Sequence, residues 1–191
     1  MDEKALVQLS KKGDEEAFSV LVKKYRAKIF NLAFSLTYDR EIADDLAQEA
    51  FIKAYFALPK FKLKSEFGTW LYRITVNHVK DYLRKKGRMD RMSLVDIKEN
   101  PFLYKDEIMK KEKDQVEEEK RRLIHECVQT LPKKYQIILS LRDIQGFSYR
   151  EIAKILKIFP GTVDSRLHRA RKMLRKKLTP LLRKKGGNHE L

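Results

Sequence analysis

Apolar residues recur at spacings of three and four along almost the whole chain, and no stretch shows the alternation of β-branched residues typical of a strand. This spacing is the period of an amphipathic helix. Glycine and proline, which interrupt helices, number only 7 and 5 in 191 residues. The sequence therefore predicts an all-α fold.

Two helical segments flank a stretch that has few apolar side chains to form a core. Around Asn100-Pro101, scattered charges and the run KKEKDQVEEEK replace the apolar periodicity. Because typical domains hold about 100–150 residues, we expect two small helical domains joined by a flexible linker, with a helix-turn-helix in the C-terminal domain. The expected ranges are 1–87 for the N-terminal domain, 88–118 for the linker, 119–185 for the C-terminal domain and 186–191 for a disordered tail.

Capping residues and helix breakers divide these domains. Asp14 and Asp39 are favoured N-caps and predict helices over about 15–36 and 39–58. A further helix is expected from about residue 69 to Gly87, which would end it. Three residues separate four helices in the C-terminal domain: Pro132, Gly146 and Pro160.

The stretch SYREIAKILKIFPGTVDSRLHRAR, residues 148–171, has the pattern of two helices at a sharp turn, the second of them basic. At about 100° per residue, Val163, Leu167, Ala170, Leu174 and Leu178 share one side, which must be buried. The opposite arc suits phosphates and base edges, so the pattern predicts a helix-turn-helix that reads DNA. Its outward residues are Thr162, Ser165, Arg166, Arg169, Lys172 and Lys176.

The helix expected over 69–86 carries a narrow basic strip between two apolar sides. The strip contains Arg73, Asn77, Lys80 and Arg84. A solvated face is one interpretation, and single-strand contact is the other, because cations interleaved with aromatics accept unstacked bases. The aromatic candidates are Phe61, Phe67 and Trp70, of which the first two lie in or beside a loop and are the better surface candidates.

As a helix, the segment EIADDLAQEAFIKAYFAL has a packing face of small residues on one side and an acidic face on the opposite side. Acidic residues disfavour DNA, whereas apolar groups among carboxylates favour a protein docking surface. The alternative is that a neighbouring helix covers the apolar members. The docking candidates are Asp44, Asp45, Gln48, Glu49, Ile52 and Tyr55.

Charge and composition restrict the classes of function. The formal net charge of +16 favours a nucleic-acid partner; a membrane surface is a weaker alternative, because no run approaches about 18 apolar residues. The first residues lack a secretory signal, so we expect a cytoplasmic protein. The single cysteine, Cys127, is expected to be a small apolar packing residue on a helix. The four histidines show no metal-ligand spacing, and no phosphate-binding glycine loop appears, so we expect no metal, no cofactor and no catalysis.

Three motifs together, DDLAQEAFIKAY, FGTWLYRITVNHVKDYLRKK and LPKKYQIILSLRDIQGFSYREIAKILKIFPGTVDSRLHRARKML, resemble bacterial sigma factors of the extracytoplasmic-function (ECF) type over nearly the whole chain. The resemblance implies a non-catalytic protein that directs core RNA polymerase to promoters. It implies that the acidic helix meets the polymerase clamp and that residues 61–86 recognise the −10 element and hold its non-template strand. It also implies that the second domain reads the −35 duplex, and that an anti-sigma protein, often tethered to the membrane, restrains the factor.

The alternative is a stand-alone helix-turn-helix regulator that binds operator DNA without polymerase. Two departures from the family pattern bear on the helix-turn-helix. Lys157 stands where a turn glycine is usual, and Asp164 stands where a lysine is common. Lys157 would carry a steric cost at positive φ. Asp164 is expected on the flank of its helix, in a local pair with His168 or Arg171, rather than on DNA.

Overall fold

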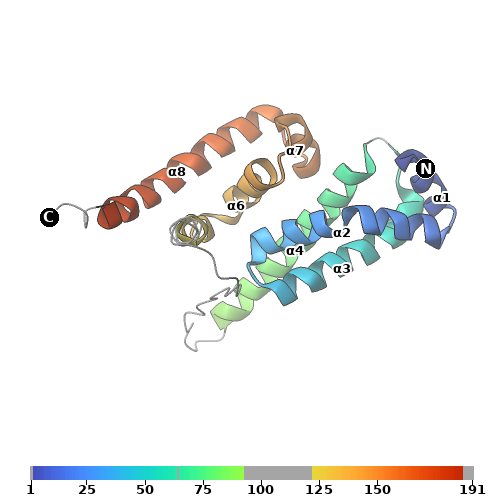
Figure 1. The fold of residues 1–191 in the computed structure, drawn as a ribbon, viewed down its shortest axis with the longest axis horizontal. Helices are drawn as coiled ribbons and strands as arrows, with labels where there is room; N and C mark the ends of the chain where they lie inside the picture. The colour runs from blue at the N-terminus through green and yellow to red at the C-terminus, as the bar shows by residue number, and fades with distance from the viewer. Residues whose placement is uncertain (1, 64, 93–121, 187–191) are drawn as a thin grey trace, which may run out of the picture.

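A computed structural model describes residues 2–63, 65–92 and 122–186 of the chain. Every regular element in these ranges is a helix, as Figure 1 shows. The prediction of an all-α fold with a helix-turn-helix near the C-terminus is confirmed. Residues 93–118 of the expected linker and 187–191 of the expected tail lie outside the described residues.

The N-terminal unit is a helical bundle whose helices begin at capping residues. The Asp14 carboxylate accepts a hydrogen bond from the Ala17 N–H at 2.9 Å, and the Asp39 carboxylate accepts one from the Ile42 N–H at 3.1 Å. Each bond satisfies a backbone donor that the first turn leaves free, so both predicted N-caps are confirmed. The elements are α1 (Glu3–Lys11), α2 (Glu15–Thr37), α3 (Arg40–Ala57), η1 (Leu58–Lys60) and α4 (Phe67–Met92).

Helix α4 is longer than predicted at both ends. It begins at Phe67 and continues through Gly87 to Met92. The predicted end at Gly87 is wrong, and residues 88–92, assigned to the linker, are helical. Glycine within a helix costs only about 1 kcal/mol relative to alanine, which does not stop a helix whose other residues favour it.

The described part of the C-terminal unit starts with a helical segment at residues 122–129. Pro132 and Gly146, which has a φ of 76°, then separate helices as predicted. Pro180 lies inside the last helix, which also includes Gly186 from the expected tail. The further elements are α6 (Lys133–Leu139), the π-helical η2 (Ser140–Ile144), α7 (Tyr149–Leu156) and α8 (Pro160–Gly186).

The core of the first unit lies between α2, α3 and α4. Leu21 and Ile29 of α2 and Leu71 of α4 are fully buried. Helix α3 contributes mainly alanines to this contact, and Ala50 and Ala54 have no exposed surface. Small side chains let helices approach closely, so α3 packs its small-residue side inward and turns its polar side to solvent.

The two units pack against each other, with α4 in contact with α7 and α2 in contact with η2. The hydroxyls of Ser35 and Ser140 form a buried hydrogen bond between them. The Tyr72 ring meets Phe147 edge-on, with ring centroids 4.6 Å apart, and its hydroxyl donates to Gln145 at 3.2 Å. Burial raises the pKa of Tyr72 to about 12, so this hydroxyl stays a donor at neutral pH. We call this arrangement the closed arrangement.

Candidate functional site

The helix-turn-helix consists of α7, a short turn and α8. Ser148 begins α7 with a capping box, in which its side chain accepts from the Glu151 N–H at 3.3 Å and the Glu151 carboxylate accepts from the Ser148 N–H at 2.8 Å. The hydrogen bonds from the Ser148 side chain and backbone lower the pKa of Glu151. The first helix of the motif therefore begins at a residue fixed by local sequence.

The turn is made without glycine. Lys157 adopts the left-handed conformation, with φ 52° and ψ 50°, and the N–H groups of Lys157 and Ile158 both donate to the Ala153 carbonyl. This is the geometry that glycine usually supplies after a helix. Lys157 thus preserves the turn geometry and carries the conformational strain that the sequence predicted.

Helix α8 presents the two sides that the sequence predicted. Val163, Leu167 and Ala170 are buried against the core of the second unit, whereas Leu174 and Leu178, which were also predicted to be buried, are only half-buried. On the outward arc, Thr162 and Arg166 are half-buried and the other four candidates are exposed: Ser165, Arg169, Lys172 and Lys176. The Ser165 hydroxyl donates to the Thr162 carbonyl at 3.2 Å, within its own helix. The arc is therefore a largely open, basic surface.

The salt bridges of α8 differ from the expectation for Asp164. Arg171 pairs with Asp143 of η2 at 2.6 Å, and no ion pair of Asp164 is formed within the described ranges. The hydrogen bond from Arg171 to Asp143 and the attraction of that carboxylate raise the pKa of Arg171. The expected pairing of Asp164 is wrong, because the tertiary fold brings another carboxylate to Arg171.

The basic strip of α4 lies partly under the second unit. Arg73 is half-buried and donates to the Lys154 carbonyl of α7 at 2.8 Å, and its Nε is buried without a hydrogen-bond partner in the part of the chain that is described. Partial desolvation and the nearby Arg166 cation lower the pKa of Lys80. Asn77 and Arg84 are exposed, and Arg84 pairs with Asp81 at 3.0 Å.

Two of the three aromatic candidates are core residues. Phe61 and Phe67 are 5% and 3% exposed, and Trp70 is half-buried and stacked on Phe61 with centroids 4.6 Å apart. The expectation that Phe61 and Phe67 lie on the surface is wrong. Phe67 opens α4 and meets Tyr25 of α2 edge-on, and burial of such large apolar rings outweighs their position beside a loop.

The acidic side of α3 is exposed, as predicted, at Asp45, Gln48 and Glu49, while Asp44 is half-buried. The Gln48 amide donates to the Asp44 carboxylate at 2.7 Å. The Glu49 carboxylate lies 2.8 Å from the Nε2 of His78 on α4. Glu49 is therefore partly engaged within the fold, whereas Asp45 faces solvent.

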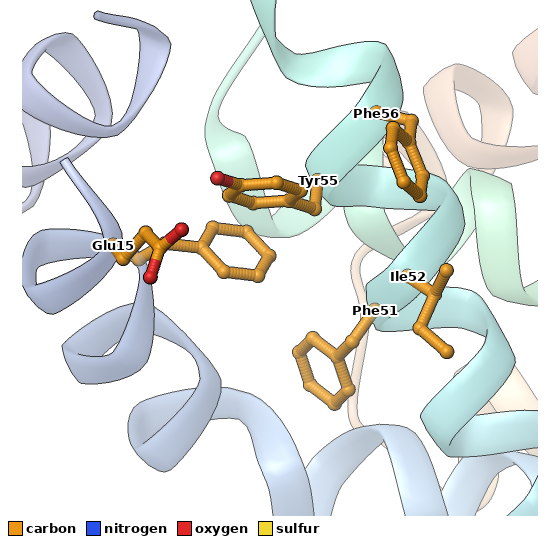
Figure 2. A pocket seen from close by; sticks show the side chains of 6 residues that line it. Glu15, Phe51, Ile52, Tyr55 and Phe56 are labelled. Carbon is orange, nitrogen blue, oxygen red and sulfur yellow. The ribbon is translucent and has the colours of Figure 1, made fainter. Parts of the chain in front are cut away.

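Next to these acids, α3 and α2 form an apolar pocket. It is lined by Glu15, Phe18, Phe51, Ile52, Tyr55 and Phe56. Figure 2 shows Tyr55 extending from α3 toward Glu15 of α2. Phe56 and Ile52 are 76% and 55% exposed, while Tyr55 is half-buried against Phe18, with centroids 5.0 Å apart.

A neighbouring helix therefore covers part of Tyr55 but leaves Ile52 open. Phe56 is not among the predicted docking residues, although it follows Ile52 at the i+4 spacing that places two residues on one helix face. That spacing is the signal that could have found it. Phe18 and Glu15 carry no such signal, because they come from another helix.

The described residues include no group of His, Cys, Asp and Glu side chains that could hold a metal ion. Within the same ranges, no helix has the length and apolar character needed to cross a membrane. Cys127 is buried, and burial raises the pKa of its thiol.

Comparisons with known proteins agree with this geometry. The family model "Sigma-70 region 2" matches residues 21–89, and "Sigma-70, region 4" matches residues 121–174. The chain is 41% identical over 182 residues to the RNA polymerase sigma-H factor of Pseudomonas aeruginosa, covering 93% of this chain and 94% of that protein. It is 38% identical over 188 residues to the ECF RNA polymerase sigma-E factor of Escherichia coli, covering 96% and 98%.

Among solved structures, the chain is similar to CnrH in complex with the cytosolic domain of CnrY. The TM-score is 0.66 and the identity 23%, with 92% of this chain and 96% of that chain covered. This likeness supports the fold alone. Together, the two matched regions and the near-full-length identity establish that the chain belongs to the sigma-70 family of RNA polymerase sigma factors and is of the ECF type, a non-catalytic protein that serves promoter-specific transcription initiation.

Proposed function

We propose that the exposed face of α3 and its pocket form the contact with core RNA polymerase. The observation that carries this proposal is the juxtaposition of the exposed Asp45 carboxylate and Gln48 amide with the open apolar side chains of Ile52 and Phe56. Charges steer association, while apolar groups that become buried supply affinity. Glu49 contributes less in this scheme, because His78 already engages it.

The strip of α4 contacts the melted strand of the −10 element through Arg73, Asn77, Lys80 and Arg84. Support comes from three basic side chains and an amide on one face, with Asn77 and Lys80 exposed. Strand separation costs unstacking energy, which the protein offsets only by binding the single strand more tightly than the duplex. Trp70, half-buried at the edge of the core, is the remaining aromatic candidate for stacking.

The outward arc of α8 reads the −35 element in the major groove. Ser165 and Arg169 are exposed within its first three turns, where recognition helices meet base edges. Lys172 and Lys176 lie further along the helix and bind phosphates. Thr162 and Arg166 complete the surface once the second unit moves away from α4.

The closed arrangement has to open before both promoter elements are bound. The −35 and −10 elements are about 25 base pairs apart, which spans roughly 85 Å of duplex, whereas α4 and α7 are in direct contact. Two features weaken that contact: the buried Nε of Arg73, which has no hydrogen-bond partner among the described residues, and the positive charge of Arg166, which helps to lower the pKa of Lys80. Polymerase binding therefore selects an open arrangement of the two units.

The protein acts in the cytoplasm, where a restraining protein would cover the polymerase-binding face. CnrH is similar to this chain in fold and was solved with the cytosolic domain of CnrY. A membrane-tethered anti-sigma protein would hold the factor at the inner face of the membrane. The pocket beside Ile52 and Phe56 is the surface that such a partner would cover.

Run-off transcription with purified core polymerase tests the docking assignment. The variant Asp45→Lys removes a carboxylate that faces solvent, so the fold should remain intact. We expect the concentration of factor needed for half-maximal transcription to rise about tenfold, as for the loss of one hot-spot contact. The matched control is Glu126→Lys, which makes the same charge change at an exposed position of the second unit.

An equal rise in the half-maximal factor concentration for both variants would mean that only net charge matters. An unchanged concentration for both would refute the assignment of α3 to the polymerase contact. A stand-alone regulator makes a different prediction. It would bind its operator in the absence of polymerase, and the start sites of transcripts would not depend on added factor.

A further inference from the structure

Phe159 is the most exposed large apolar side chain in the described part of the chain, at 83%. It precedes Pro160, the first residue of α8. Single exposed apolar side chains are common on protein surfaces, so the exposure of Phe159 does not by itself indicate a role. Its position does: Phe159 lies directly before the second helix of a basic helix-turn-helix, where such helices contact base edges.

Phe159 occupies a position where the fold favours a different residue. Its carbonyl accepts from the N–H groups of Thr162 at 2.9 Å and Val163 at 3.2 Å, which makes it the N-cap of α8. A phenyl ring cannot accept a hydrogen bond from the first turn, as a polar N-cap does. The other helix starts with a side-chain cap use Asp14, Asp39 and Ser148.

The apolar contact at this helix start is already made by other residues. Ile158, which precedes the N-cap, is partly buried and packs on the core, and Val163 at the fourth helical position is fully buried. These are the two positions of a hydrophobic staple. Phe159 therefore contributes neither a cap nor a staple, and its ring remains in solvent.

We propose that Phe159 enters the major groove of the −35 element and contacts the C5-methyl group of a thymine. The first residues of a recognition helix meet base edges, and the thymine methyl is the apolar group that the major groove offers to an apolar side chain. The exposed cations Lys172 and Lys176 lie further along the same helix and supply phosphate affinity. This inference rests on the assignment of α8 to the −35 duplex.

The test uses holoenzyme assembled from the full chain and core polymerase, with a −35 element first mapped by run-off transcription. Each thymine of the element is replaced in turn by deoxyuridine, which lacks only the methyl group. We expect one replacement to weaken binding about fourfold with the natural chain, the effect of removing one buried methyl. With Phe159→Ala that replacement should have no effect, while the other positions respond as before.

A second variant separates a DNA contact from a structural role. Phe159→Ser supplies a side-chain cap, so it should raise the melting temperature while abolishing the deoxyuridine effect. A fall in melting temperature would assign Phe159 to the fold and overturn the proposal. So would a mapped element without thymine, a deoxyuridine effect that persists in both variants, or an equal loss on all DNA caused by weaker polymerase binding.

Failure of the underlying assignment gives a different result. If a scrambled −35 element binds as tightly as the mapped one, α8 does not read that element and this inference falls with it. If the scrambled element binds weakly but no thymine position responds to deoxyuridine, the assignment of α8 stands and only the role of Phe159 is refuted.

Discussion

Replacing Lys157 with glycine should stabilise the helix-turn-helix, although it removes side-chain atoms. Lys157 holds φ 52° and ψ 50° at the end of α7. A side chain with a Cβ in this region meets a backbone oxygen, and glycine does not. The backbone hydrogen bonds to the Ala153 carbonyl do not depend on the side chain, so the variant keeps them.

The expected magnitude follows from two opposing effects. The left-handed conformation costs a residue with a Cβ about 1–2 kcal/mol. Removing the Cβ relieves this strain, but glycine loses more chain entropy on folding, which cancels about 0.4–1 kcal/mol of the stabilisation. The net increase in the free energy of unfolding should therefore be about 0.5–1 kcal/mol.

A matched control lies three residues earlier. Lys154 is exposed within α7, and its replacement by glycine removes the same charge and the same side chain. In a helix interior, glycine is less favourable than lysine, so Lys154→Gly should destabilise by about 0.7 kcal/mol. The two substitutions are identical in chemistry and should differ in sign because the backbone conformations differ.

Amide hydrogen exchange measures this locally, which avoids assuming that both units unfold together. The amide of Leu167, a buried residue of α8, should be protected, and its exchange rate then reports the opening free energy of the helix-turn-helix. Protection should rise in Lys157→Gly and fall in Lys154→Gly. Equal or lower protection in Lys157→Gly would show that the turn does not hold the left-handed conformation in solution.

Gly68→Ala should destabilise the first unit by about 1–3 kcal/mol in urea denaturation, because a Cβ there would lie 2.8 Å from the Tyr25 hydroxyl oxygen. The control Gly87→Ala has open space around the new Cβ and should be neutral or stabilising. Equal changes in the free energy of unfolding would refute the clash at Gly68. Burial lowers the pKa of His125 to about 4 in the folded protein, whereas in the unfolded chain the histidine has its ordinary pKa near 6.5. The free energy of unfolding is therefore highest above about pH 6.5 and falls as the pH drops toward 4, because the unfolded chain binds a proton that the folded protein does not. His125→Gln should flatten the loss of melting temperature over that range, and an unchanged slope would exclude His125 as its source. Arg169→Ala should weaken −35 binding by about 1–3 kcal/mol if it contacts a base, whereas a uniform loss on all DNA would identify a phosphate contact.

Local patterns in the sequence predicted the helices and their polar faces well. The caps at Asp14 and Asp39 and the buried side of α8 follow from interactions within four residues, which are visible in the sequence. The end of α4 could not be predicted from Gly87, because a single glycine only weakly disfavours a helix and α4 continues through it to Met92.

Contacts between distant residues could not be predicted in this way. Phe61 and Phe67 were expected on the surface because they lie beside a loop, yet helices from other parts of the chain bury them. The pairing of Arg171 with Asp143 replaced a local pair for the same reason. The pocket beside Phe56 combines residues of α2 and α3, and only folding brings Phe18 next to Tyr55.

The sequence by itself determined the helical class, the order of the helices and the outward position of Arg169, Lys172 and Lys176 on α8, because helical periodicity is a local property. Only the tertiary structure decided which aromatics are buried, where Arg171 pairs, and that the charge of Arg166 helps to lower the pKa of Lys80. Burial and charge pairing depend on the distance between residues far apart in the chain, and that distance is set by packing.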